Sequence, residues 1–227
     1  MGSKIGSDRY ATLAERQAAR WERARQAKAH PAKPAVALSR LPGSGGEEVA
    51  RLVAERLDFG LFGREIVEQV AEDLGVDHWL VDGLDEHVHS AIERSLSNLF
   101  GRNSVDEDRF QRSVARAVTT LGRRGSVVIV GRGAPFLLSE HDALRVLLVA
   151  PREQRAKRYA EVKALEAGHA ESELGLAERQ RADFARRHFG ADLSDPARYD
   201  LSLNTGTLGF EGAADLIVEA YRRRFPG

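Results

Sequence analysis

Short apolar runs of strand length recur along the middle of the chain. Residues 35–39, 126–130 and 144–149 are nearly continuous in apolar residues, which is typical of strands buried on both faces of a parallel sheet. A glycine cluster follows the first run at residues 43–46, and apolar residues then recur at helical spacing from Val49 to Leu57. A strand, a glycine loop and a helix open a βαβ unit, so this pattern predicts an α/β fold with a parallel sheet.

Helical periodicity dominates the stretches between and after these runs. Residues 64–122 are predicted to be a mostly helical insert between two strands, with its last helix at 109–121. Residues 151–190 are predicted to be a highly charged helical stretch, broken around Gly168 to Gly175. The predictions for the end of the chain are a strand at 199–204 and an amphipathic helix at 212–224.

Composition places the chain among soluble globular proteins. Of its 227 residues, 42% are hydrophobic and 30% charged, and 34 Lys and Arg balance 34 Asp and Glu. No global charge therefore marks an obligate nucleic-acid binder. There is no cysteine, which removes disulfides and thiol chemistry and suits a reducing cytoplasm. No apolar run approaches the roughly 18 residues that cross a bilayer, so we expect a cytoplasmic protein with no membrane partner.

The first 34 residues differ from the rest in charge. Up to Ala35 there are eight Lys or Arg against three Asp or Glu, a net charge of +5, and residues 10–29 are rich in helix formers. We predict a basic N-terminal helical extension and linker over residues 1–34. It is either a basic arm for an anionic partner such as RNA, or a solvated helix that docks on its own domain through Trp21.

The glycine loop has a composition that suits phosphate. Its backbone N–H groups converge at the start of a helix, where unpaired donors and the helix dipole favour anions. The loop does not fit G-x-G-x-x-G, because Glu48 stands at the third glycine. It does not fit G-x-x-x-x-G-K-[ST] either, because Glu47 stands at the lysine and Glu48 at the hydroxyl residue.

Four blocks in order nevertheless resemble the cytidylate kinase-like family, which are nucleoside monophosphate kinases of P-loop fold. The blocks are residues 39–49, 62–66, 127–134 (with 144–158 in register) and 199–205. The resemblance implies a three-layer P-loop domain over residues 35–227 with a parallel sheet. It also implies a helical acceptor-binding insert at about 61–122 and an arginine-rich lid at about 151–190.

The resemblance assigns roles to the loop and to two arginines. The segment formed by Gly43, Ser44, Gly45, Gly46, Glu47 and Glu48 would hold the phosphates of ATP, with Mg²⁺ as the cofactor. Arg64 and Arg132 would hold the acceptor monophosphate. Arginine suits this task because its planar fork binds phosphate oxygens in pairs.

The resemblance also assigns roles in the lid. Arg179, Asp183 and Arg186 fall near one another on a helix and would, with Arg132, carry the catalysis, while Arg155 and Arg158 belong to the first lid helix. Phosphoryl transfer depends mainly on positioning and charge neutralisation, so mobile arginines fit the mechanism. The activity implied is ATP-dependent phosphorylation of a pyrimidine nucleoside monophosphate, with CMP or dCMP as the first expectation.

Three positions depart from the family pattern. Glu47 replaces the loop lysine, Glu48 the hydroxyl residue and Gly133 the aspartate of G-R-D. Like charges about 4 Å apart repel by roughly 4 kcal/mol at an effective dielectric of 20, so Glu47 should weaken triphosphate binding unless Mg²⁺ or an arginine intervenes, with Arg40 and Arg132 as the candidates. A structural alternative makes Ser44 and Glu47 an S-x-x-E capping box. Two other functions stay open: a nucleotide-binding relative without catalysis, and an interaction protein acting through residues 1–34.

Overall fold

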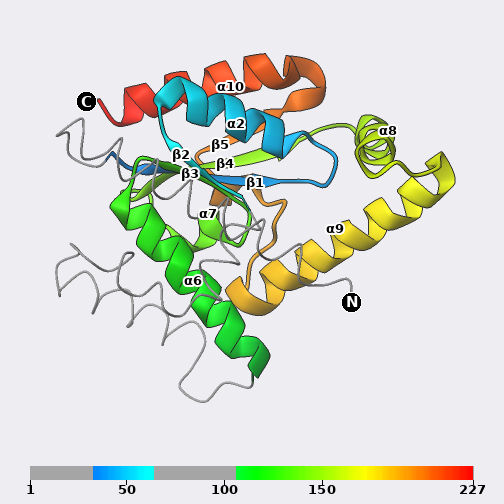
Figure 1. Ribbon diagram of the computed structural model, residues 1–227, viewed down its shortest axis with the longest axis horizontal. Helices are drawn as coiled ribbons and strands as arrows, with labels where there is room; N and C mark the ends of the chain where they lie inside the picture. The colour runs from blue at the N-terminus through cyan, green and yellow to red at the C-terminus, as the bar shows by residue number, and fades with distance from the viewer. Residues whose placement is uncertain (1–32, 64–105, 227) are drawn as a thin grey trace, which may run out of the picture.

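The computed structural model describes residues 33–63 and 106–226, which form a five-stranded sheet between helical layers (Figure 1). The strands are β1 (Ala35–Arg40), β2 (Gly60–Phe62), β3 (Val127–Val130), β4 (Ala143–Val149) and β5 (Leu201–Asn204). The helices are α2 (Gly46–Leu57), α6 (Asp106–Arg124), α7 (Ala134–Leu137), α8 (Arg152–Lys163), α9 (Ala167–Phe189) and α10 (Thr205–Arg224). A short 3-10 helix, η2 (Pro196–Arg198), precedes β5.

All five strands are parallel, in the order β2-β3-β1-β4-β5. The central strand β1 pairs along its whole length with β4, from Ala35 opposite Ala143 to Arg40 opposite Leu148. The chain leaves β1 towards β2 on one side and leaves β3 towards β4 on the other. Open α/β sheets bind ligands at such a switch point, in the crevice outside the carboxyl ends of the strands.

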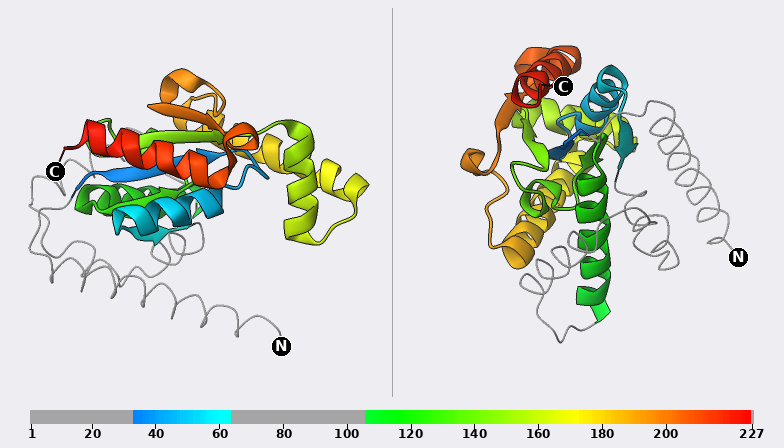
Figure 2. Two further views of the ribbon diagram at one scale, coloured as in Figure 1. Left: turned by 90° about the horizontal axis from the view of Figure 1, so that it is seen from above. Right: turned by 90° about the vertical axis from the view of Figure 1, so that its left-hand side faces the viewer.

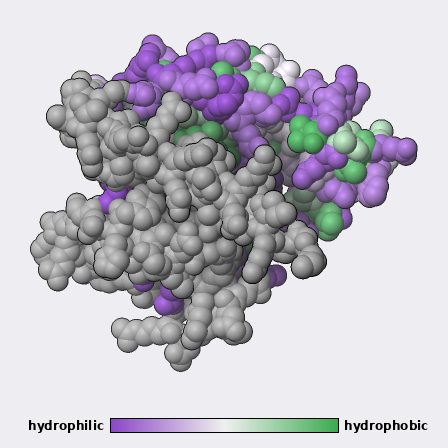
Figure 3. All heavy atoms as spheres, in the orientation of Figure 1, coloured by the Kyte–Doolittle hydropathy of each residue, from purple (hydrophilic) through white to green (hydrophobic). Residues whose placement is uncertain are grey.

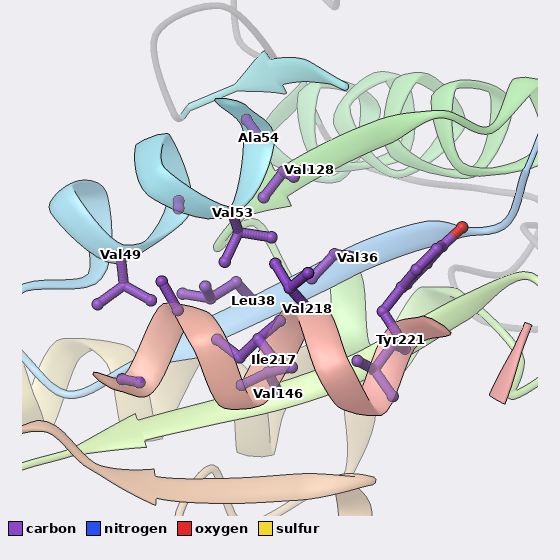
Figure 4. Close-up of a cluster of buried hydrophobic side chains, with 14 of the residues drawn as sticks. Val36, Leu38, Val49, Val53, Ala54, Val128, Val146, Ile217, Val218 and Tyr221 are labelled. Carbon is purple, nitrogen blue, oxygen red and sulfur yellow. The ribbon is translucent and has the colours of Figure 1, made fainter. Parts of the chain in front are cut away.

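One face of the sheet is covered by α2 and α10, which pack side by side (Figure 4). Val36 and Leu38 of β1 point into this layer and meet Val53 of α2 and Ile217 of α10, all fully buried. Val36 and Leu38 fill this core, and Ala35 and Ala37 lie in the core on the opposite face. Burial on both faces explains the nearly continuous apolar run at residues 35–39.

The opposite face of the sheet is covered by α6 and α7. Val118 and Leu121 of α6 are fully buried against Ala35, Ala37 and Ile129 of the sheet. In the layer formed by α2 and α10, the outer side is mainly hydrophilic over α10 (Figure 3). This layer is therefore amphipathic, with its apolar side on the sheet. The predicted three-layer arrangement with a parallel sheet is confirmed.

The helices α8 and α9 lie beyond the carboxyl ends of the strands, past the loop that follows β1 (Figures 1 and 2). They follow β4 in the chain and pack on each other. Because of this position, the hairpin of α8 and α9 is the part of the described chain best placed to cover the crevice at the switch point.

Among the described helices, none is long and apolar enough to cross a membrane.

The carboxylate of Asp200 connects β4, the start of β5 and the end of α10 through hydrogen bonds and ion pairs. Asp200 Oδ2 accepts hydrogen bonds from the Arg145 backbone N–H at 2.8 Å and from its Nε at 3.2 Å. Asp200 Oδ1 accepts from Arg145 at 2.9 Å and lies 3.0 Å from Arg224. Burial raises the pKa of Asp200, but the hydrogen bonds and charges of the two arginines outweigh it, so this pKa lies below its usual value.

The structure corrects several predicted boundaries. The break in the charged helical stretch lies at Ala164 to Glu166, and Gly168 and Gly175 lie inside α9. The final helix begins at Thr205 instead of Gly212, with a kink at Gly209, where φ is 68°. The predicted extension at 1–34 and most of the predicted insert at 61–122 lie outside the described residues.

Candidate functional site

The glycine loop between β1 and α2 is held by the strands around it. Gly43 and Gly45 have φ values of 80° and 76°, the left-handed region that glycine adopts without strain. The hydroxyl of Ser44 donates to the carbonyl oxygens of Leu41 at 2.8 Å and Leu148 at 3.2 Å. Thr205, at the start of α10, donates its hydroxyl to the Ser44 carbonyl at 2.9 Å. The loop is therefore a fixed structure that two neighbouring strand ends hold in place.

The N-terminus of α2 keeps its backbone donors available. Its N-cap is Gly45, which offers no side-chain cap, so the predicted capping box of Ser44 and Glu47 is wrong. The physical reason is that the helix begins at Gly46, which makes Gly45 the N-cap, while the side chain of Ser44 is directed to the carbonyl oxygens of Leu41 and Leu148. The first N–H groups of a helix have no intrahelical acceptor and, with the helix dipole, favour an anion.

A cavity of about 660 Å³ opens at the carboxyl ends of β1 and β3. Its walls come from residues 39–48, from the loop after β3, and from α8 and α9. The basic side chains that line it are Arg40, Arg132, Arg158, Lys163 and Arg181. Against these five stand two acidic residues among the described lining, Glu47 and Glu48. The cavity lies at the switch point, and its excess of positive charge suits a ligand with several negative charges.

The two glutamates of the glycine segment behave differently. Glu48 lies 2.6 Å from Arg158 of α8, and the guanidinium of Arg158 also lies 4.1 Å from the centre of the Phe210 ring. Glu47 is exposed in the cavity and makes no ion pair or hydrogen bond within the described part of the chain. Glu48 is therefore neutralised by the α8–α9 hairpin, while Glu47 keeps its carboxylate available for a cation.

The loop after β3 carries Arg132 in an unusual backbone conformation. Gly131, Arg132 and Gly133 all have positive φ, with 51° for Arg132, which a non-glycine residue rarely adopts. Such conformations concentrate at binding and catalytic sites. The structure places Arg132 in the cavity wall beside the glycine loop. Its predicted role with the acceptor monophosphate stays a prediction.

Gly133 stands where the family pattern has an aspartate, and the structure gives a reason. A Cβ atom on Gly133 would lie 2.3 Å from the ring of Phe189. That ring stacks on Phe136 with centroids 5.3 Å apart and meets the edge of Phe184 at 5.8 Å. An aromatic wall formed by Phe136, Phe184 and Phe189 thus replaces the carboxylate at this side of the cavity.

The face that α9 turns to the cavity differs from the one expected. The residues that line the cavity are Ala177, Gln180, Arg181, Phe184, Ala185 and Phe189. Arg181 donates to the carbonyl oxygen of Arg40 at 2.9 Å, so it reaches the end of β1. Arg179, Asp183 and Arg186 are exposed and outside this lining, and the last two pair with each other at 3.0 Å. Their predicted catalytic roles stay predictions.

Gln180 and Arg181 were not among the site residues predicted from the sequence. A signal was present, because Ala177, Phe184 and Ala185 mark the buried side of the helix at helical spacing, and both residues lie on that side.

Arg155 lies behind the glycine loop instead of in the cavity lining. Its side chain is 7% exposed and binds Glu178 of α9. Its Nε donates to the Ala150 carbonyl at 2.9 Å, and another nitrogen donates to the Pro42 carbonyl at 3.3 Å. The donors of Arg155 therefore join α8, α9 and the glycine loop, and its predicted role as a lid residue toward phosphate stays a prediction. Arg64 lies outside the described residues.

Sheet order, glycine loop and basic cavity together define a P-loop protein of the kinase type. Residues 35–207 match the sequence pattern of the cytidylate kinase-like family. A cytidylate kinase of Natronomonas pharaonis is 32% identical over 162 residues, which cover 69% of this chain and 82% of that enzyme. A cytidylate kinase of Halobacterium salinarum is 27% identical over 186 residues, 82% of this chain and 88% of the relative. The chain belongs to the cytidylate kinase-like family.

A solved structure supports the fold independently. The crystal structure of an uncharacterized protein from Eubacterium ventriosum superimposes with a TM-score of 0.68 at 21% identity, covering 84% of this chain and 99% of that one. The predicted α/β fold with a parallel sheet is confirmed by the sheet order, and this solved structure shares the fold. Family membership confirms the prediction of an enzyme, a kinase of the nucleoside monophosphate class.

Proposed function

We propose that this protein transfers the γ-phosphoryl group of ATP to a pyrimidine nucleoside monophosphate, with CMP or dCMP as the preferred acceptor. The observation that carries the proposal is the cavity at the switch point, where a fixed glycine loop and five basic side chains converge. The curated relatives named above are cytidylate kinases, which supports the choice of acceptor.

The donor nucleotide is assigned to the glycine loop. The N–H groups at the start of α2 would bind its phosphates. Of the two carboxylates in the described cavity lining, Glu47 is the one without a protein partner, and it would contribute to holding Mg²⁺, which prefers one or two carboxylates together with phosphates and water. When bound, Mg²⁺ supplies charge neutralisation at the phosphates.

The acceptor is assigned to the side of Arg132. Arg132 would bind the monophosphate with Arg64, because a guanidinium forms two parallel hydrogen bonds to phosphate oxygens. The aromatic wall of Phe136, Phe184 and Phe189 adjoins it and offers an apolar surface for a flat base. Gln180 and Arg181 of α9 line the same cavity, where Arg181 would neutralise charge on the transferred group and Gln180 would donate a hydrogen bond to it.

An ADP-release assay with Mg·ATP and CMP, dCMP, UMP, AMP or GMP tests the proposal. We expect turnover highest with CMP or dCMP, and at least about tenfold lower turnover for Arg132→Ala, the loss typical of one charge-stabilising donor. Arg223→Ala is the matched control, because Arg223 is exposed on α10 and pairs only with Glu219 among the described residues. Turnover with AMP or GMP alone would refute the pyrimidine assignment. Nucleotide binding without turnover of any acceptor would point to a binding role instead.

A further inference from the structure

Arg40 is the last residue of β1, and its side chain runs through space that two glycines leave open. A Cβ atom on Gly46, at the start of α2, would lie 2.5 Å from the Cγ of Arg40. A Cβ atom on Gly131, in the loop after β3, would lie 2.2 Å from an Arg40 guanidinium nitrogen. Both distances are far below any contact between carbon or nitrogen atoms that are not bonded. Gly46 therefore has no room for a side chain where the base of the Arg40 side chain passes, whereas the flexible guanidinium end of Arg40 could move away from a side chain at residue 131.

Arg40 brings a positive charge to the part of the loop where this chain has a glutamate in place of a lysine. The family-type loop has a lysine in the first turn of this helix, and here that position is Glu47. Among the other basic residues of the cavity, Arg158 is paired with Glu48. Lys163 comes from the last turn of α8. Arg40 is the basic side chain that packs directly against the N-terminus of α2.

The position of Arg40 is also fixed from the backbone. Its carbonyl oxygen accepts a hydrogen bond from Arg181 at 2.9 Å, and its strand position pairs with Leu148 of β4. A side chain whose base is held on both sides loses less conformational entropy when it binds a ligand. Arginine is suited to phosphate because its donors form a rigid planar fork.

We propose that Arg40 binds the donor polyphosphate in place of the missing loop lysine, and that glycine at position 46 leaves the space through which its side chain passes. The inference rests on the proposed function, since it assigns a residue to the ATP side of the same site. It makes Arg40 a phosphate-binding residue that enters from the strand end, whereas a loop lysine enters from the helix. Glu47 is then free to act as a carboxylate toward the cation.

The test measures ADP affinity by isothermal titration calorimetry in the full-length protein, with thermal unfolding of each variant in the absence of nucleotide. We expect Arg40→Ala to bind ADP at least about tenfold more weakly, and Arg40→Lys to retain most of the affinity, because it keeps the charge. Arg51→Ala is the matched control, since Arg51 is an exposed arginine of α2 that pairs with Glu55 outside the cavity. That control should bind ADP as the wild type does.

Two double variants distinguish a contact between Arg40 and the phosphates from a purely structural role of Arg40. Glu47→Lys should restore much of the ADP affinity that Arg40→Ala loses, because it returns a cation to the first turn of α2. Gly46→Ala should weaken ADP binding severalfold when Arg40 is present and add less when residue 40 is alanine, because only the Cβ of residue 40, at 2.9 Å, then remains close to the new methyl group. Gly46→Ala keeps every charge, so it remains informative even if Arg40→Ala fails to fold.

The outcomes distinguish the inference from the function on which it rests. Wild-type turnover together with unchanged ADP affinity in Arg40→Ala would overturn the inference alone. A lower unfolding temperature of Arg40→Ala with unchanged ADP affinity would assign Arg40 a structural role and overturn it as well. Additive effects of Gly46→Ala and Arg40→Ala would refute the role given to the glycine. A wild-type protein that neither binds ADP nor turns over nucleotide would overturn both the inference and the proposed function.

Discussion

Replacing Arg155 by methionine separates the structural position of this residue from a role in binding phosphate. Methionine keeps much of the apolar stem but leaves the carbonyls of Ala150 and Pro42 without the donors that bind them now. A buried acceptor left unsatisfied costs about 1–3 kcal/mol. Glu178 keeps its second partner, Arg152, at 2.7 Å, so the loss of the ion pair is only partial. We expect a total loss of about 3 kcal/mol in the free energy of unfolding.

The assay is thermal unfolding of the nucleotide-free protein, followed by circular dichroism. For a chain of 227 residues, each kcal/mol shifts the midpoint by about 2–4 °C, so Arg155→Met should unfold about 6–12 °C below the wild type. Arg152→Met is the matched control, because it removes another arginine from Glu178 but one whose side chain is 51% exposed. Its shift should be much smaller, since exposed ion pairs contribute little.

The pH dependence gives this prediction a second readout. Burial raises the pKa of Glu178, but the hydrogen bonds and charges of Arg155 and Arg152 outweigh it, so the pKa lies below its usual value. A lowered pKa stabilises the fold above the unfolded value of about 4.3 and loses that contribution as the pH falls through the folded value. The gap between wild type and Arg155→Met should therefore narrow below about pH 4. Unchanged unfolding of Arg155→Met with lost ADP binding would refute this reasoning and favour a phosphate contact.

Four further predictions concern other positions of the described chain. Gly43→Ala should lower stability by about 1–3 kcal/mol in urea unfolding, because φ is 80° and the new Cβ would lie 2.3 Å from the Arg155 carbonyl oxygen. Gly168→Ala, which meets no atom within 4 Å inside α9, should leave stability unchanged or raise it. Asp200→Asn should lower the unfolding temperature at pH 7, and the difference should shrink below about pH 4, because the lowered pKa of Asp200 stabilises the fold only above that range. Arg181→Ala should reduce CMP turnover more than Arg179→Ala, and equal losses would contradict the orientation of α9.

The sheet could be predicted from the sequence because its strands are buried on both faces. A strand that is covered on both faces, such as β3, is apolar at every position, so residues 127–130 could be assigned to the interior of a sheet. The glycine loop could be placed for a related reason, since a cluster of glycines between a strand and a helix has few other uses. Both signals are local in the sequence and can be recognised without knowledge of the packing.

The orientation of α9 could not be predicted with the same security. Charged residues occupy much of its 23 positions, so the apolar side is narrow and the cavity-facing residues do not stand out from their neighbours. Its two internal glycines suggested a break, yet a glycine inside a helix costs only about 1 kcal/mol, which the packing of α9 on α8 offsets. The failed capping box has a similar origin, because Ser44 bonds the carbonyl of Leu148, 104 residues away.

The space left open at each glycine of the site shows how its parts depend on one another. The position of a Cβ at Gly43 is filled by the backbone of Arg155, at Gly45 by the ring of Phe210, and at Gly133 by the ring of Phe189. These neighbours belong to α8, α10 and α9, all of which come later in the sequence than the glycines that they contact. Because Arg155 also donates to the Pro42 carbonyl, α8 cannot shift against β1 without breaking contacts to the loop. The glycine loop is therefore shaped by the helices around the cavity as much as by its own sequence, and a loop held in this way does not need a lysine to keep its conformation.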